Sequence, residues 1–119
     1  MCGIAGYIGK QQISKSTINK TLHLMKNRGP DFQDSRSFNV NDTNIYLLHS
    51  RLSIIDLEMR SNQPFSFNGL TLVFNGEIYN YIELRKKLIK KGHTFATSSD
   101  TEVLLKAYVE YGEDCVEHF

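Results

Sequence analysis

The sequence has no long apolar run and almost no net charge. No stretch approaches the roughly 20 apolar residues that a membrane-spanning helix requires. The N-terminus lacks a basic region, and its short apolar run is broken by Gly3, Gly6 and Gly9, so it does not have the form of a signal peptide. A net charge of +1 provides no strong field that would recruit nucleic acid or a membrane. We therefore expect a cytoplasmic chain that fits one domain and has no nucleic-acid or membrane partner.

Cysteine is also scarce. Cys2 and Cys115 stand near opposite ends of the sequence, and there is no C-x-x-C pair. Nothing in the sequence supports a disulfide between them, so we expect free thiols in a reducing compartment. The 4 histidines are scattered without the spacing of metal ligands, and we predict no metal site.

One basic cluster is present, at residues 85–91 (RKKLIKK). It contains no aromatic residue on which a base could stack, which argues against a single-stranded nucleic-acid platform. We interpret the cluster as the solvated face of a helix.

The first part of the chain predicts a strand followed by a helix. Residues 2–8 are small and apolar, which is typical of a buried strand. Ile18, Leu22 and Met25 then recur at helical spacing, and this helix should end near Gly29.

The middle of the chain predicts strands separated by loops. Residues 28–34 (RGPDFQD) have the composition of a turn, and residues 44–56 carry one or two strands. The polar segment 58–68 contains Pro64 and should be a loop, whereas residues 70–74 form an apolar strand.

The last part predicts two helices with N-terminal capping signatures. Asn80 is followed by Glu83, and Ser99 by Glu102, each at the spacing of a capping box. Glycines at positions 92 and 112 should end the two helices. Three to five strands and three helices in this order indicate an α+β fold with a small core. We expect the chain to be an N-terminal portion of something longer.

Cys2 raises a chemical question because it follows the initiator methionine. Removal of Met1 would leave Cys2 with a free α-amino group, whose pKa is about 7.7–8.0 in peptides. Such an amine can act as the base for the thiol of the same residue, as it does for N-terminal threonine. The alternative is a small buried cysteine that stands near the start by chance.

The Asn75-Gly76 pair has two interpretations. Between apolar segments, an Asn-Gly pair is typical of a two-residue hairpin turn, and the pair alone favours this reading. The other reading is an oxyanion hole, in which the Asn amide and the Gly N–H donate to one oxygen. The helix predicted directly downstream counts against the hairpin.

Three charged residues suit the binding of an amino acid. Arg51 could hold a carboxylate through two parallel hydrogen bonds, and Glu77 and Asp100 could receive an ammonium group. Each also has a plain structural reading: a surface ion pair for Arg51, and compensation of the helix dipole for Asp100.

Several motifs in a fixed order resemble one family. They are M-C-G-I-A-G at the start, R-G-P-D (28–31), H-S-R-L-S-I-I-D (49–56), Q-P-F (63–65), N-G-E-I-Y-N (75–80) and S-D-T-E-V (99–103). Together they resemble the glutaminase domain of glutamine-hydrolysing asparagine synthetases, within the class II glutamine amidotransferases. The resemblance runs from residue 2 to about residue 112.

The resemblance implies a role for each matching position. Cys2 is the nucleophile that hydrolyses L-glutamine to glutamate and ammonia, Asn75 and Gly76 form the oxyanion hole, and Asp31 has no catalytic role. The remaining implied glutamine-binding residues are Arg51, for the α-carboxylate, Glu77 and Asp100, for the α-ammonium, and the backbone of Leu52, Ser53, Ile54 and Ile55.

The resemblance also implies an architecture. The expected fold is the N-terminal-nucleophile αββα sandwich, of which residues 1–119 form a truncated amidotransferase domain. The chain itself should need no cofactor. ATP and magnesium would serve a synthetase domain, absent here, that uses the ammonia to amidate aspartate or a related acid. A homodimer is compatible with the resemblance.

Two other functions are also compatible with the sequence. A truncated domain could act only as a binding module without turnover. A different N-terminal-nucleophile hydrolase could act on another amide, but the pairing of Arg51 with Glu77 and Asp100 fits a free α-amino acid better.

Overall fold

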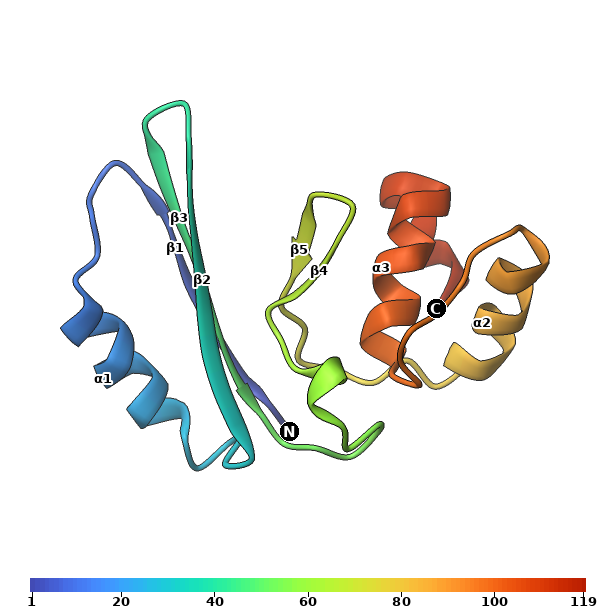
Figure 1. Cartoon of the computed structure of the whole chain (residues 1–119), viewed down its shortest axis with the longest axis horizontal. Coiled ribbons are helices and arrows are strands. Elements are labelled where there is room, and N and C mark those ends of the chain that lie inside the picture. Colours follow the sequence, from blue (N-terminus) through green and yellow to red (C-terminus); the bar gives the residue numbers. More distant parts are fainter.

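The computed structural model describes residues 1–119. Figure 1 shows its elements in successive layers: a helix, a three-stranded sheet, a two-stranded hairpin, and a pair of helices. In chain order the elements are β1 (Gly3–Gly9), α1 (Lys15–Met25), β2 (Phe32–Val40), β3 (Thr43–Arg51), η1 (Met59–Ser61), β4 (Phe65–Phe67), β5 (Leu70–Leu72), α2 (Tyr81–Lys90), α3 (Asp100–Tyr111) and η2 (Gly112–His118).

The larger sheet is antiparallel, with the strand order β1-β3-β2. Helix α1 covers one face of it and begins at Ser14, whose side chain accepts a hydrogen bond from the Thr17 N–H. Gly3 allows the close approach of this helix, because a Cβ there would lie 3.2 Å from the Cβ of Met25. The sheet therefore holds the start of β1 beside the end of β3.

At the Gly9 end of β1, the other face of this sheet carries exposed apolar side chains. Ile8 and Phe38 both lie opposite Ile45 in the strand register, so the three side chains share one face. Ile8, Phe38 and the neighbouring Val40 are all exposed. This face points toward the β4–β5 hairpin in Figure 1, but the longer strands extend beyond the hairpin.

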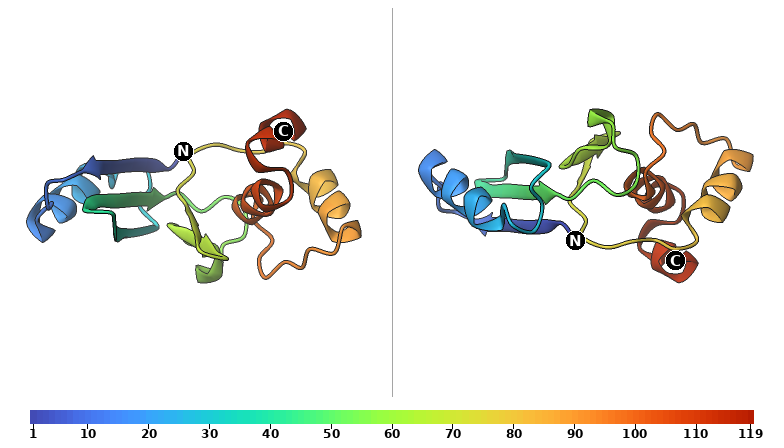
Figure 2. Two further views of the ribbon diagram at one scale, coloured as in Figure 1. Left: turned by 90° about the horizontal axis from the view of Figure 1, so that it is seen from above. Right: turned by 90° about the horizontal axis from the view of Figure 1, so that it is seen from below.

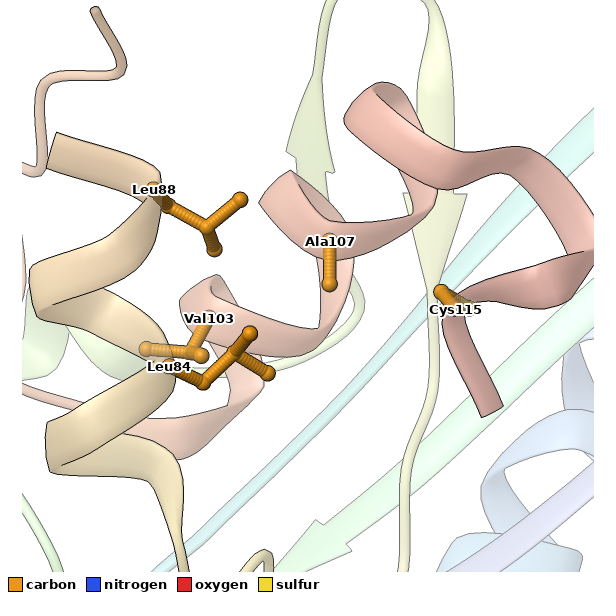
Figure 3. Packing of buried hydrophobic residues seen from close by; sticks show 5 residues of the cluster. All are labelled: Leu84, Leu88, Val103, Ala107 and Cys115. Carbon is orange, nitrogen blue, oxygen red and sulfur yellow. The ribbon is translucent and has the colours of Figure 1, made fainter. Parts of the chain in front are cut away.

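The second half of the chain has its own hydrophobic core. Leu84 and Leu88 of α2 pack against Val103 and Ala107 of α3, and Cys115 of η2 completes the cluster (Figure 3). Helix α3 contacts both β4 and β5 on its other side. The buried apolar side chains thus fix α3, whose first turn faces the candidate site.

Two sequence-based expectations about the strands were wrong. Residues 28–34 are not all loop, because β2 begins at Phe32 and pairs with β3 along nine positions. Its sequence is too polar to show strand alternation, and the pairing with β3 makes it a strand. The strand expected over 70–74 ends at Leu72, and its partner, β4, lies inside the segment 58–68 that was expected to be a loop.

The hairpin that the Asn75-Gly76 pair favours when it is considered alone is absent. No strand follows this pair, and α2 begins at Tyr81. The turn of the β4–β5 hairpin is instead the Asn68-Gly69 pair, whose φ angles of 49° and 76° are those of a tight hairpin turn. Two Asn-Gly pairs therefore occur in the chain, and only the first turns a hairpin.

The two predicted capping signatures differ in outcome. Ser99 accepts a hydrogen bond from the Glu102 N–H, as expected. Asn80 occupies the N-cap position of α2 without capping it: its amide nitrogen donates to the His118 carbonyl, and its side-chain oxygen has no hydrogen-bond partner. The basic cluster is the mostly exposed surface of α2, as predicted, although Arg85 donates to the Thr97 carbonyl.

No helix combines the length and the apolar character that crossing a membrane requires.

Candidate active site

A cavity of about 320 Å³ lies where the two halves of the molecule meet. In both views of Figure 2 the N-terminus stands between the three-stranded sheet and the helical half. The lining comes from the N-terminus, the end of β3, the loops before β4 and α2, and the start of α3. Its residues are Met1, Cys2, Arg51, Leu52, Ile54, Ile55, Ser61, Gln63, Phe74, Asn75, Gly76, Glu77, Tyr79, Ser99, Asp100 and Thr101. Its volume falls in the range of roughly 300–1,000 Å³ that small-molecule sites occupy.

Cys2 stands one residue before β1, rather than within the strand as expected. Its Sγ atom lies 3.4 Å from the Leu52 nitrogen, whose N–H donates to it. The thiol is half-buried and free, and it lines the cavity. Met1 is exposed beside it and also lines the cavity.

The R-G-P-D motif holds the residues around Cys2. Arg28 donates through Nε to the Cys2 carbonyl at 3.1 Å, and Asp31 accepts from the Ser53 N–H at 2.7 Å. Gly29 packs directly on the backbone of β3, since a Cβ there would lie 2.2 Å from the Ser50 oxygen. The motif thus acts structurally, and Asp31 contacts the loop rather than the cavity.

Arg51 is buried at the end of β3, and its guanidinium is engaged by the following loop. Its two terminal nitrogens donate to the carbonyls of residues 55, 56 and 58 and to the Asn62 side chain. These four bonds use the four N–H groups of those nitrogens, which leaves the Nε–H and the positive charge for a ligand. Arg51 therefore shapes the loop that carries Leu52, Ile54 and Ile55 into the cavity wall.

Of the four loop residues expected to line the site, Ser53 is the exception. Leu52, Ile54 and Ile55 line the cavity, whereas the Ser53 N–H is directed to Asp31.

Asn75 and Gly76 line the cavity from the segment between β5 and α2. Gly76 lies against the Phe74 ring, because a Cβ there would come within 2.7 Å of the ring edge. A side chain at position 76 would therefore displace that ring. The closeness of the Phe74 ring therefore explains why position 76 is a glycine, and no unusual backbone conformation is needed to explain it.

Glu77 and Asp100 both lie at the cavity, but in different environments. Asp100 is buried at the first turn of α3, and one carboxylate oxygen accepts a hydrogen bond from the Ile78 N–H at 3.2 Å. Glu77 is exposed. Asp100 consequently ties the Asn75–Ile78 segment to α3 and presents a fixed negative charge, opposite in sign to Arg51.

Asp56 fixes the loop between β3 and η1, although it does not line the cavity. Burial of this carboxylate would raise its pKa, but hydrogen bonds from the Ser98 N–H, the Glu58 N–H and Arg60 outweigh that effect and hold the pKa at about 2. The contact with Ser98 joins this loop to the segment before α3. The two walls that carry Arg51 and Asp100 are thereby linked.

Several cavity residues were given no catalytic or substrate-binding role from the sequence. They are Ser61, Gln63, Phe74, Tyr79, Ser99 and Thr101. Gln63 belongs to the Q-P-F motif and Ser99 to S-D-T-E-V. These motifs marked both positions but did not indicate what the two residues do at the site. Tyr79 likewise belongs to the N-G-E-I-Y-N motif, whereas Ser61 belongs to no quoted motif and reaches the site only because loops distant in sequence converge there.

The structure brings together no group of three or more His, Cys, Asp or Glu side chains that could hold a metal ion.

Comparison with known proteins identifies the family of this chain. The domain family described as "Glutamine amidotransferase domain" matches residues 1–119. "Asparagine synthetase [glutamine-hydrolyzing] 3" of Bacillus subtilis is 40% identical over 125 residues, covering 99% of this chain and 20% of that protein. "Putative asparagine synthetase [glutamine-hydrolyzing] 2" of Methanocaldococcus jannaschii is 39% identical over 137 residues, covering 100% of this chain and 26% of that protein.

A plant relative gives the same match: "Asparagine synthetase [glutamine-hydrolyzing] 1" of Arabidopsis thaliana is 41% identical, covering 98% of this chain and 20% of that protein. The chain thus spans about a fifth to a quarter of the length of these relatives. Because the family match covers every residue, including all those at the cavity, the chain belongs to the glutamine amidotransferase domain family.

Proposed function

We propose that the chain hydrolyses free L-glutamine to glutamate and ammonia, with Cys2 as the nucleophile once Met1 has been removed. One observation carries the proposal. A thiol next to the N-terminus shares a small cavity with a buried cation, Arg51, and a buried carboxylate, Asp100. That is the set of groups that a free α-amino acid with a reactive side-chain amide requires.

The reaction begins with transfer of the Cys2 thiol proton to the α-amine of the same residue. The thiolate then attacks the side-chain amide carbon of glutamine, and the carbonyl electrons move to oxygen. The Asn75 amide and the Gly76 N–H stabilise that oxyanion by donating to it. Collapse of the intermediate breaks the C–N bond, the proton returns to the leaving nitrogen, and ammonia departs from a γ-glutamyl thioester. Water, deprotonated by the α-amine, then releases glutamate and restores the thiol.

The charges at the cavity would select free glutamine over a peptide glutamine. Arg51 attracts the α-carboxylate, and Asp100 and Glu77 attract the α-ammonium. A glutamine within a peptide lacks both charges and would leave these groups desolvated and unpaired, which is costly. The backbone of Leu52, Ile54 and Ile55 would border the same amino acid.

The larger assembly is also a proposal. The helix–sheet–sheet–helix order in Figure 1 supports an N-terminal-nucleophile sandwich of which residues 1–119 form a portion. The names of the relatives support ammonia transfer to an acid, with aspartate as the leading candidate. An ATP- and magnesium-dependent synthetase domain of a longer polypeptide would use the ammonia, and this step takes place outside the residues described here. The proposed location is the cytoplasm, and a homodimer is compatible with the proposal.

The nucleophile is tested by Cys2→Ala, which we expect to abolish release of glutamate from glutamine, because it removes the attacking sulfur. Cys115→Ala is the matched control: Cys115 is buried in the helical core and does not line the cavity, so its loss should preserve activity. A coupled glutamate assay measures both. Glutamate release by the Cys2→Ala variant would exclude this mechanism.

The role of the α-amine is tested by an N-terminal extension that a protease removes to leave Cys2 as the first residue. We expect no activity before cleavage and activity after it, with the N-terminus read by mass spectrometry. Equal activity in both forms would show that the α-amine is not the base.

A further inference from the structure

Phe74, the residue before the Asn75-Gly76 pair, is held by two side chains from other parts of the chain. Its N–H donates to Oε1 of Gln63 at 2.6 Å, and its carbonyl lies 3.3 Å from Nε2 of His49. Segment 73–80 belongs to no helix or strand, so its backbone groups cannot find partners in a regular ladder. At Phe74, contacts with two side chains take the place of the backbone hydrogen bonds of a strand or helix.

Both side chains are themselves fixed. His49 is completely buried on β3, and Gln63 is buried and donates through Nε2 to Thr101 at 3.2 Å. The Gln63 contact therefore connects Phe74 to α3, while the His49 contact connects it to the three-stranded sheet. Because both side chains are buried, neither can move freely in solvent.

The peptide plane explains why this matters for the site. The Phe74 carbonyl and the Asn75 N–H belong to the same planar peptide group. A hydrogen bond that fixes the carbonyl therefore fixes the direction in which the chain enters Asn75. That plane sets the position of the Asn75 Cα, from which the Asn75 side chain and the Gly76 N–H extend.

The contact also determines which His49 nitrogen carries the proton. A carbonyl only accepts hydrogen bonds, so Nε2 must be the donor. The other nitrogen, Nδ1, is buried without a partner. Burial lowers the pKa of His49, an effect that the bond to the Phe74 carbonyl opposes and the nearby Arg51 charge reinforces. Neutral imidazole with the proton on Nε2 is the form that fits.

We propose that His49 and Gln63 are positioning residues that orient the Asn75-Gly76 donors by holding the two backbone groups of Phe74. The proposal rests on the glutaminase function proposed above. Neither residue touches the substrate amide in this proposal: each acts through the Phe74 backbone.

The structural part is tested on the wild-type chain by NMR at pH 7. We expect His49 to show the neutral form protonated at Nε2, and the Phe74 amide to exchange slowly with solvent. Gln63→Met, which removes the acceptor, should speed that exchange at least tenfold. A His49 protonated at Nδ1, or a Phe74 amide that exchanges at the rate of an open loop, would overturn the proposal.

The catalytic part is tested by two substitutions of one residue. His49→Leu removes the donor, and we expect kcat for glutamine to fall about tenfold or more while KM stays within about twofold. His49→Gln places an amide N–H near the position of Nε2 and should recover most of the loss. His23→Leu, an exposed histidine on α1, is the matched control and should leave kcat unchanged.

Further readouts separate positioning from general damage. Alkylation of Cys2 by iodoacetamide does not need the oxyanion donors, so its rate should be equal in wild type and His49→Leu. Full kcat in His49→Leu, or a His49→Gln variant no better than His49→Leu, would overturn the proposal. If the wild-type chain releases no glutamate, the proposed function fails, and the NMR results alone decide whether His49 and Gln63 hold Phe74.

Discussion

Gly29 shows how a single residue controls the site without lining it. It lies against the backbone of Ser50 and Arg51, where β3 ends and the cavity loop begins. The atoms it faces belong to the main chain of a central strand, so they cannot rotate away as a side chain could. Any side chain at position 29 would push the R-G-P-D motif away from β3.

We therefore expect Gly29→Ala to destabilise the fold by about 3 kcal/mol, at the upper end of overpacking effects. Gly69→Ala is the matched control, because a Cβ there meets nothing within 4 Å and only the positive φ of 76° opposes it. That variant should lose about 1 kcal/mol. Urea denaturation measures both, and equal losses would show that contact with β3 is not what requires Gly29.

Asp56 is a second residue whose effect reaches beyond its own loop. Its side chain is 2% exposed and accepts hydrogen bonds from both walls of the cavity. Because its pKa is held at about 2 in the fold, below the usual 3.8, the ionised form stabilises the folded state. This contribution is complete above about pH 4 and is lost as the pH falls through about 2.

We expect Asp56→Asn to reduce the free energy of unfolding by about 2 kcal/mol at pH 7, because Asn forms weaker hydrogen bonds with these donors. The difference from wild type should shrink as the pH falls from 4 to 2, where wild-type Asp56 also becomes neutral. Asp42→Asn, in the exposed β2–β3 turn, should be nearly neutral throughout. Denaturation curves at several pH values test this, and a constant difference would contradict it.

At the scale of elements, the first turn of α3 connects stability to ligand binding. Ser99 caps the helix, and the next residue is Asp100, which bonds to the Ile78 N–H. Glu102 bonds back to the backbone of Ala96 and Thr97 and so fixes the segment that enters the helix. The helix start is thus held from both sides of Asp100.

We expect Ser99→Ala to cost about 1 kcal/mol of stability and to raise KM for glutamine, since Asp100 loses its fixed position. Ser14→Ala removes the corresponding cap of α1, on the far side of the sheet from the cavity. Ser14→Ala should reduce the free energy of unfolding by a similar amount without changing KM for glutamine. Thermal unfolding combined with glutaminase kinetics distinguishes the two, and equal KM values would remove the proposed link to Asp100.

Local sequence predicted elements well where each element carries its own signal. The helices and the Ser99 cap followed from spacing and from capping residues. Strand β2 did not, because FQDSRSFNV is polar and takes its conformation from β3. The two Asn-Gly pairs show the same limit, since strand pairing around residues 68–69, rather than the dipeptide, makes the hairpin.

The candidate site was predictable to a different degree. The motifs pointed to Cys2, Arg51, Asn75, Gly76, Glu77 and Asp100, and all six line one cavity. Their spacing could not reveal that Arg51 bonds mainly to its own loop. Nor could it reveal that His49 and Gln63 meet at Phe74, because three distant segments must first fold together.

At the scale of the whole molecule, the group of exposed apolar side chains on one face of the three-stranded sheet is the main departure from an ordinary surface. Ile8 is 72% exposed on the edge strand β1, next to other apolar side chains on the same face. Exposed apolar faces and free strand edges promote association.

We expect the isolated chain to self-associate as its concentration rises, and Ile8→Lys to reduce this association with little loss of stability. Leu24→Lys is the control, because Leu24 is equally exposed, at 73%, but lies on α1. Sedimentation velocity measures the change. Equal association of the two variants would place the contact elsewhere.

The position of the cavity between two separately packed halves has a thermodynamic consequence. The buried apolar cluster lies entirely in the helical half, and polar contacts such as those of Asp56 with Ser98 and of His49 with Phe74 join the halves across the site. An amino acid bound between Arg51 and Asp100 would add a contact to each half at once. Occupancy of the site and cohesion of the two halves would then be one coupled equilibrium, in which substrate concentration sets how often the halves separate.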